Sequence, residues 1–227
     1  MYDVRLDRES GDLRMSEVSA FITPAALVTV RKDDQFDMDA VVAQWDRSSD
    51  LAHCGVSFLL YGLIDHVVDS HFAAVQDLDE AIEELEDMLF DDGTPDSDLQ
   101  RRSFALRKSL VILRRVVLPM REVVNSLMRR DLKVVGDEML PYYQDVYDHV
   151  LRATEWTESL RDLVSTILET NLTQQGNRLN VITKKVTSWA AIIAVPTAIT
   201  GWYGQNLPYP GFASTAGLVS SAVLIVG

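Results

Sequence analysis

Apolar residues recur every three or four positions through most of the chain, and this spacing predicts three long helices. The first helix is predicted from Asp46 to about Asp91, where Gly93 and Pro95 break the pattern. A second helix is predicted from Asp96 or Asp98 to about Arg130. The third is predicted to start near Pro141, because proline favours a first helical turn.

Before the helices, three short segments have the composition of β-strands. They are Asp3 to Leu6, Arg14 to Ile22 and Ala26 to Arg31. Three strands make a poor independent sheet. We therefore interpret residues 1–45 as the end of a cytoplasmic α/β domain that is incomplete here.

The third helix meets no pair of helix breakers before Tyr203-Gly204. Some 60 residues at 1.5 Å each give a helix of roughly 90 Å, about three times the thickness of a bilayer core. Its first part, residues 141–186, is therefore expected to be a stalk in the cytoplasm. Apolar residues at helical spacing predict that the stalk packs against neighbouring helices or copies of itself: Val146, Val150, Ala153, Leu160, Val164 and Ile167.

Charge divides the chain sharply. From Thr187 to Gly227 the sequence contains no Asp, Glu, Lys, Arg or His, so the preceding part carries the whole net charge of −13. About 20 uncharged residues are needed to cross a bilayer, and residues 187–204 are predicted to do so as a first transmembrane helix. Because Lys184 and Lys185 directly precede this run, the N-terminal part is expected on the cytoplasmic side of the plasma membrane.

A second apolar stretch follows a loop that is rich in proline and glycine. It extends from Ala213 to Gly227, which is too short to span a bilayer. The expected fold is a mainly α, multi-pass membrane protein whose second transmembrane helix is truncated. Its predicted parts are the end of the α/β domain (1–45), a cytoplasmic helical hairpin (46–140), the stalk helix (141–186), transmembrane helix 1 (187–204), an external loop (205–212) and the start of transmembrane helix 2 (213–227).

The third helix has two unlike faces near its end. One face, which we call the small-polar face, carries only small or polar side chains, whereas the remainder carries residues such as Trp189, Ile192 and Trp202. Small residues permit close packing of membrane helices, but repeated amide and hydroxyl groups also suit the lining of a narrow, water-filled pore. Both interpretations remain open for the small-polar face: Asn180, Thr183, Thr187, Ala190, Ala194, Thr197 and Gly201, continued by Gly204.

The segment Tyr203-Gly204-Gln205-Asn206, directly after this helix, resembles the Tyr-Gly-Met-Asn signature of the CorA-type magnesium transporter family. The likeness covers almost the whole chain. Gln205 departs from the family's methionine, which affects the expected ion preference more than the fold. Further matching segments are Tyr61 to Asp65, Leu118 to Val123, Asp145 to His149, Arg161-Asp162 and Asn180.

The resemblance implies a homopentamer in which the long helix of each subunit lines the pore. It places Gly204 and Asn206 at the external entrance, with Tyr203 and Gln205 in the same motif, and Asn180, Thr197 and Gly201 along the pore. It also implies that Asp145 belongs to a regulatory magnesium site. The implied activity is magnesium influx, driven by the membrane potential and gated by intracellular divalent cations.

Other classes of activity lack their motifs. The sequence has no glycine-rich phosphate loop and no His and Cys spacing typical of a catalytic metal site, so we expect neither an enzyme nor an organic cofactor. Cys54 is the single cysteine, which agrees with a reducing cytoplasm. Asp145 and His149, one helical turn apart, have a spacing that can hold zinc, although a simple surface pair is the commoner meaning. The expected partners are lipid and further copies of the chain, and no nucleic acid.

Two alternatives stay open at this point. In the first, the chain is a related transporter that moves zinc, cobalt or nickel, with or without proton coupling. A membrane-anchored coiled-coil scaffold without transport is the other possibility, and it predicts that Asn206→Ala and Gly204→Ala leave ion uptake unchanged.

Overall fold

The computed structural model describes residues 1–7, 11–91, 95–129, 134–204, 211 and 214–226. These residues form two compact units, Met1–Asn171 and Leu172–Gly227. The elements follow one another in the order β1 (Tyr2–Leu6), β2 (Leu13–Ile22), β3 (Leu27–Arg31), α1 (Met38–Arg47), a 3-10 helix η1 (Ser49–Cys54), α2 (Val56–Phe90), α3 (Asp96–Leu127), α4 (Leu140–Tyr203) and α5 (Thr215–Val226).

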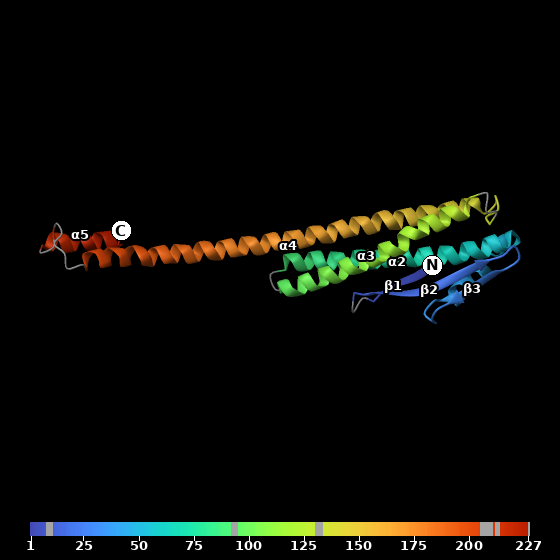
Figure 1. Ribbon diagram of the computed structural model, residues 1–227, viewed down its shortest axis with the longest axis horizontal. Coiled ribbons are helices and arrows are strands. Elements are labelled where there is room, and N and C mark those ends of the chain that lie inside the picture. Colours follow the sequence, from blue (N-terminus) through green and yellow to red (C-terminus); the bar gives the residue numbers. More distant parts are fainter. Residues whose placement is uncertain (8–10, 92–94, 130–133, 205–210, 212–213, 227) are drawn as a thin grey trace. The chain divides into compact units, whose positions relative to one another are not determined.

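The three strands form one antiparallel sheet in the order β1-β2-β3. Each strand lies within one residue of its predicted bounds. Figure 1 shows the sheet beside α2, and two hydrogen bonds join them. The backbone N–H of Val4 donates to Ser70 Oγ at 3.2 Å, and His71 Nε2 donates to the Tyr2 carbonyl at 2.8 Å. Burial lowers the pKa of His71, so its ring is a neutral part of the core.

The helix predicted from Asp46 to Asp91 is wrong in its first part. A separate helix, α1, ends at Arg47, and α2 begins only at Val56. The chain turns between them at Gly55, whose φ of 63° favours glycine. Asp37 begins α1 as an N-cap by accepting a hydrogen bond from the Ala40 N–H at 2.9 Å.

Trp45 holds α1 against α2. Its ring N–H donates to the Leu59 carbonyl at 3.1 Å, and a Cβ added at Gly62 would lie only 2.5 Å from Trp45 Nε1. Gly62 is therefore required where the two helices meet. This close contact gives a structural reason for the glycine in the segment Tyr61 to Asp65, which matches the family.

The core of the first unit lies between α2, α3 and the first part of α4. Tyr143, on α4, is fully buried, and its hydroxyl donates to the Ser57 carbonyl of α2 at 2.9 Å. Phe72 and Trp156 meet edge to face with their centroids 5.3 Å apart. The apolar series predicted on the stalk is buried throughout: Val146, Val150, Ala153, Leu160, Val164 and Ile167.

Packing of the stalk against neighbouring helices is therefore confirmed, and those helices belong to the same chain. Thr157, which interrupts the apolar series, is buried as well, and its hydroxyl is satisfied there because it donates to the Ala153 carbonyl at 2.7 Å. The series gives no support for contact between copies of the chain, since the single chain already covers it.

Length and composition single out one described helix, α2, as able to cross a membrane. Its apolar stretch is 56% buried inside the protein, as expected of a core helix. The end of α4 is not singled out in this way, because threonine, glycine and aromatic residues lower its mean hydropathy. That residues 187–204 span a membrane thus stays a prediction.

Candidate functional site

The small-polar face lies in the second unit, along the last part of α4. Every member from Asn180 to Gly201 is in helical conformation and exposed in the chain. Gly204 follows in a turn, where its N–H donates to the Thr200 carbonyl at 2.8 Å. The spacing predicted from the sequence therefore does bring these residues onto one helix, in a row.

The hydroxyl of Thr197 shows how this face presents oxygen. It donates its proton to the Ile193 carbonyl one turn earlier, at 2.7 Å. The proton is then directed into the helix, and the two lone pairs of Oγ1 are left for an outside donor. Water molecules around a cation are such donors, because the ion orients their hydrogens outward.

Large apolar side chains cover the rest of this part of α4. Trp189 and Ile193 are each 66% exposed in the single chain. Surfaces of this size are rarely left to water in soluble monomers. The same kind of exposure continues on α5, and the set from residue 180 onward is Val181, Ile182, Val186, Trp189, Ile192, Ile193, Val195, Trp202, Leu218, Val219, Val223 and Leu224.

The predicted signature is described only in part. Tyr203 is the last residue of α4, and Gly204 forms the turn after it. Gln205 and Asn206 lie outside the described residues. Their predicted place at an external entrance therefore stays a prediction.

Asp145 lies on α4 in the first unit and is exposed. Its charge acts on Tyr61 of α2. The pKa of Tyr61 is raised to about 12, first by burial and then by the charges of Asp65, Asp69 and Asp145. Three carboxylates thus contribute to the potential around one hydroxyl. The sequence marked Asp145 alone, because the other two lie on α2, which is distant from Asp145 in the sequence.

Asp65 is the partly buried member of this group. Gln44 Nε2 donates to its Oδ2 at 2.6 Å. Burial raises the pKa of Asp65, and the neighbouring Asp69 raises it further, whereas Gln44, His149 and His66 act in the opposite direction. An ionised Asp65 therefore costs folding free energy unless a cation is nearby.

His66 and His149, the two histidines that act on the pKa of Asp65, each lie against an aromatic ring. The His66 ring meets Phe36 edge to face, with centroids 5.6 Å apart, and His149 lies against Phe72 at 6.4 Å. Among the described residues, no third His, Cys, Asp or Glu converges with Asp145 and His149 to form a cluster of metal ligands. We therefore assign that pair no zinc site.

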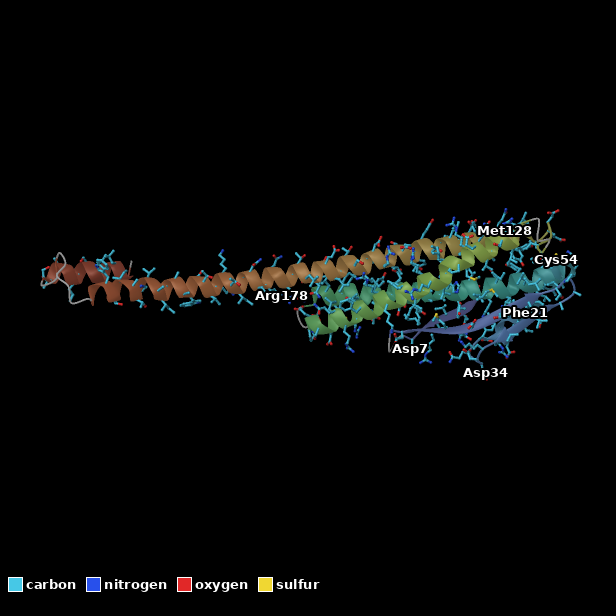
Figure 2. All side chains as sticks on the ribbon, viewed as in Figure 1. Asp7, Phe21, Asp34, Cys54, Met128 and Arg178 are labelled. Carbon is cyan, nitrogen blue, oxygen red and sulfur yellow. The ribbon has the colours of Figure 1, made fainter. Side chains whose placement is uncertain are left out.

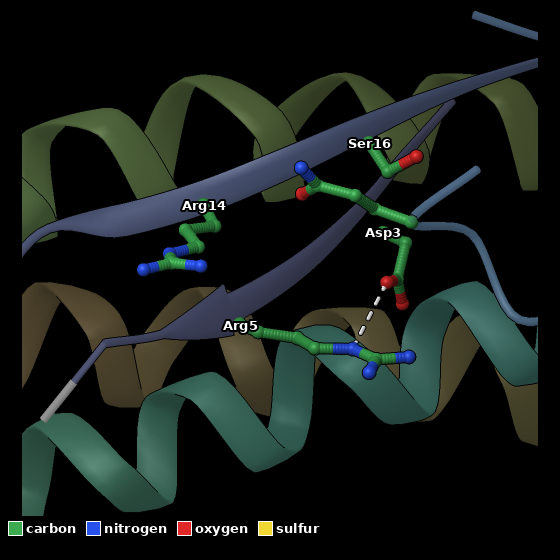
Figure 3. A pocket seen from close by; sticks show the side chains of 5 residues that line it. Asp3, Arg5, Arg14 and Ser16 are labelled. Carbon is green, nitrogen blue, oxygen red and sulfur yellow. Dashed lines mark ion pairs between the residues drawn. The ribbon is translucent and has the colours of Figure 1, made fainter. Parts of the chain in front are cut away.

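A pocket of about 330 Å³ lies on the sheet (Figure 3). Its arginines have carboxylate partners: Arg5 Nε lies 3.4 Å from Asp3 Oδ2, and Arg14 lies 2.6 Å from Asp7. These pairs neutralise its positive charge locally, so we assign it no ligand. Gln35 and Ser16 complete the lining.

Comparison with known proteins covers the whole chain. A profile of the family described as "CorA-like Mg2+ transporter protein" matches residues 1–227. The cobalt/magnesium transport protein CorA of Thermotoga maritima is 31% identical over 205 residues, which are 89% of this chain and 58% of that relative. The zinc transport protein ZntB of Yersinia enterocolitica is 23% identical over 210 residues, which are 92% of this chain and 63% of the relative.

Among solved structures, the complete CorA magnesium transporter from Methanocaldococcus jannaschii superposes with a TM-score of 0.69 at 20% identity. The alignment covers 98% of this chain and 76% of that one. This likeness shows the fold: a small sheet, a helical core and a long helix that continues from the core.

The charge on Asp65 gives a test of stability. Asp65→Asn removes the charge and keeps an oxygen that can accept from Gln44. Because the pKa of Asp65 is raised in the folded state, that state binds the proton more readily than the unfolded chain, and the ionised carboxylate is destabilising above the folded-state pKa. At pH 7 in EDTA, Asp65→Asn should raise the thermal unfolding midpoint.

This gain should shrink as the pH falls through the folded-state pKa, because wild-type Asp65 then becomes protonated too. Asp148→Asn, at an exposed position of α4, is the control and should change stability by less than about 0.5 kcal/mol. A lower midpoint for Asp65→Asn at pH 7 contradicts this account.

Proposed function

This chain belongs to the CorA-like Mg2+ transporter family, and we propose that it carries divalent cations, magnesium first, across the plasma membrane through a pore built by several copies of α4. The observation that carries the proposal is the contrast on α4. A row of small and polar residues is exposed on the same helix as large apolar residues.

Water alone does not solvate this helix favourably. If each fully buried large apolar side chain gains about 1.5–3 kcal/mol, lipid contact along α4 and α5 is strongly favoured. The small-polar face has the opposite need, since hydroxyl and amide groups lose hydrogen bonds in hydrocarbon. Several copies arranged around an axis, five by analogy with the family, would satisfy both faces.

The pore so formed suits magnesium chemically. Mg²⁺ gives up its water slowly and usually keeps several water ligands when bound. Rings of carbonyl, hydroxyl and amide oxygens can accept hydrogen bonds from the hydrated ion without holding it too tightly to leave. We therefore propose that Thr197, Asn180 and the signature residue Asn206 contact a cation with its water shell.

The membrane potential would drive the ion inward. A divalent cation gains about 4.6 kcal/mol per 100 mV, twice the value for a single charge. Lys184 and Lys185, just before the uncharged run, support an orientation with the first unit in the cytoplasm. No nucleotide hydrolysis is needed for this influx.

Transport of zinc, cobalt or nickel is the second candidate. Two observations favour it: zinc transport proteins are among the relatives, and Gln205 stands where the family signature has methionine. Flux measured with and without a proton gradient separates it from channel-like magnesium influx.

For regulation, we propose that intracellular magnesium binds near Asp145 and closes the pore. The support is electrostatic, because Asp145, Asp65 and Asp69 act together on Tyr61 and burial disfavours the ionised form of Asp65. A divalent cation would offset this cost. Its loss would then leave repulsive charges that loosen the closed arrangement.

Removing one hydroxyl of the pore tests the function. Thr197→Val keeps the shape of the side chain but removes the oxygen, so magnesium uptake into liposomes should fall roughly tenfold or more, since each lost hydrogen bond to the ion's water costs about 1 kcal/mol in every subunit. Ser188→Ala is the matched control. Its hydroxyl also donates to the carbonyl four residues earlier, Lys184, but from another side of the helix. Uptake by Thr197→Val equal to that of the wild type would contradict a pore lined by Thr197, and wild-type uptake no greater than that of protein-free liposomes would favour a scaffold without transport.

The regulatory role of Asp145 has its own test. In Asp145→Asn, magnesium on the cytoplasmic side should inhibit currents only at higher concentration than in the wild type, because one charge of the site is lost. Asp148→Asn, three residues along α4, should leave inhibition as it is. Equal inhibition of Asp145→Asn and the wild type rejects the role.

A further inference from the structure

Three potential metal ligands converge at one end of the first unit. His53 and Cys54 are the last two residues of η1, between α1 and α2, and Glu138 lies in the turn before α4. Figure 2 labels Cys54 at this end of the unit. Each of the three offers one ligand atom, and these atoms all lie within 4.8 Å of one another.

From this geometry we propose that His53 Nε2, Cys54 Sγ and Glu138 form a binding site for a zinc-like transition metal ion, separate from the small-polar face and from Asp145. The site would join the α1–α2 connection to the start of α4, 85 residues later. The proposal does not depend on transport.

The distances suit a tetrahedral ion. His53 Nε2 lies 2.8 Å from Glu138 Oε1 and 3.7 Å from Cys54 Sγ. Zinc binds nitrogen and oxygen at about 2.0 Å and sulfur at about 2.3 Å, so its ligand atoms lie roughly 3.3–3.7 Å apart. Small shifts of the exposed His53 and Glu138 side chains and of the partly buried Cys54 side chain are enough to reach that arrangement.

The second ring nitrogen of His53 is held as in many metal sites. Nδ1 lies 2.7 Å from the Asp50 carbonyl, which has no proton and must accept. Nδ1 therefore carries a hydrogen, and in the neutral ring Nε2 presents a lone pair toward Glu138. Metal-bound histidines commonly donate their other N–H to such a carbonyl.

Two groups with lone pairs, His53 Nε2 and the Glu138 carboxylate, face each other at 2.8 Å. The contact is attractive only when a proton or a metal ion lies between them. Without metal this is a proton, and accordingly the Glu138 hydrogen bond raises the pKa of His53. A metal ion can replace that proton and recruit the nearby thiol as thiolate.

The ligand set also defines which ions fit. Imidazole and thiolate favour Zn²⁺, Co²⁺ and Ni²⁺ over Mg²⁺, which prefers oxygen ligands. Three protein ligands leave a fourth position for water. We infer a site that responds to transition metals in the presence of excess magnesium.

Cobalt is a direct probe because a thiolate bound to Co²⁺ absorbs in the near ultraviolet. Cys54 is the single cysteine of the sequence, so such a band reports this site alone. The protein is titrated with Co²⁺ in excess Mg²⁺ and a thiol-free reductant. We expect the band in the wild type, its loss on adding Zn²⁺, and no band in Cys54→Ser.

The other ligands are tested by affinity. Glu138→Gln and His53→Gln should weaken cobalt binding by about tenfold or more, in the range seen when partners of a metal site are removed. Asp137→Asn, an exposed carboxylate beside Glu138, is the control and should bind as the wild type does. Circular dichroism establishes that each variant is folded. A wild type without the band overturns the proposal, and so does equal affinity in Glu138→Gln and His53→Gln, since the thiol then binds metal alone.

Discussion

The two parts of α4 differ in whether the rest of the chain covers their apolar side chains, and the proposed function depends on this difference. From Tyr143 to Ile167 the helix buries one face against α2 and α3, and the chain itself supplies the cover. Beyond Leu172 the described part of the chain offers no such cover, and tryptophan, isoleucine and valine side chains are exposed. Hydrophobic surface of this extent is typical of a surface that lipid or protein covers. The membrane insertion and the assembly proposed above both rest on this one constraint.

In the first unit, potential metal-binding side chains gather at two places. Its surface near α2 and α4 gathers Asp65, Asp69 and Asp145, and burial works against the charge of Asp65. The junction before α4 gathers His53, Cys54 and Glu138. The first group has oxygen ligands suited to magnesium, whereas the second has the nitrogen and sulfur that transition metals prefer. Both groups include residues at or near the beginning of α4, the helix proposed to line the pore.

Local patterns were sufficient for most of the fold. Strand-like composition located β1 to β3, the helical spacing of apolar residues located α3 and α4, and the signature indicated the family correctly. The α1–α2 turn was missed because it depends on one positive φ at Gly55 and on Trp45 packing over Gly62. The metal-ligand cluster was missed for a related reason. His53 and Glu138 are 85 residues apart, and only the tertiary fold brings them together.

The central claim is that the small-polar face surrounds water in the assembled membrane protein. In a Cys54→Ser background, Thr197→Cys and Ile199→Cys place a thiol at nearly the same depth but on opposite sides of the helix, since two residues turn it by about 200°. A water-soluble thiol reagent should modify Thr197→Cys and block ion flux, and it should leave Ile199→Cys unmodified in lipid. Modification of Ile199→Cys with an unreactive Thr197→Cys would contradict the account.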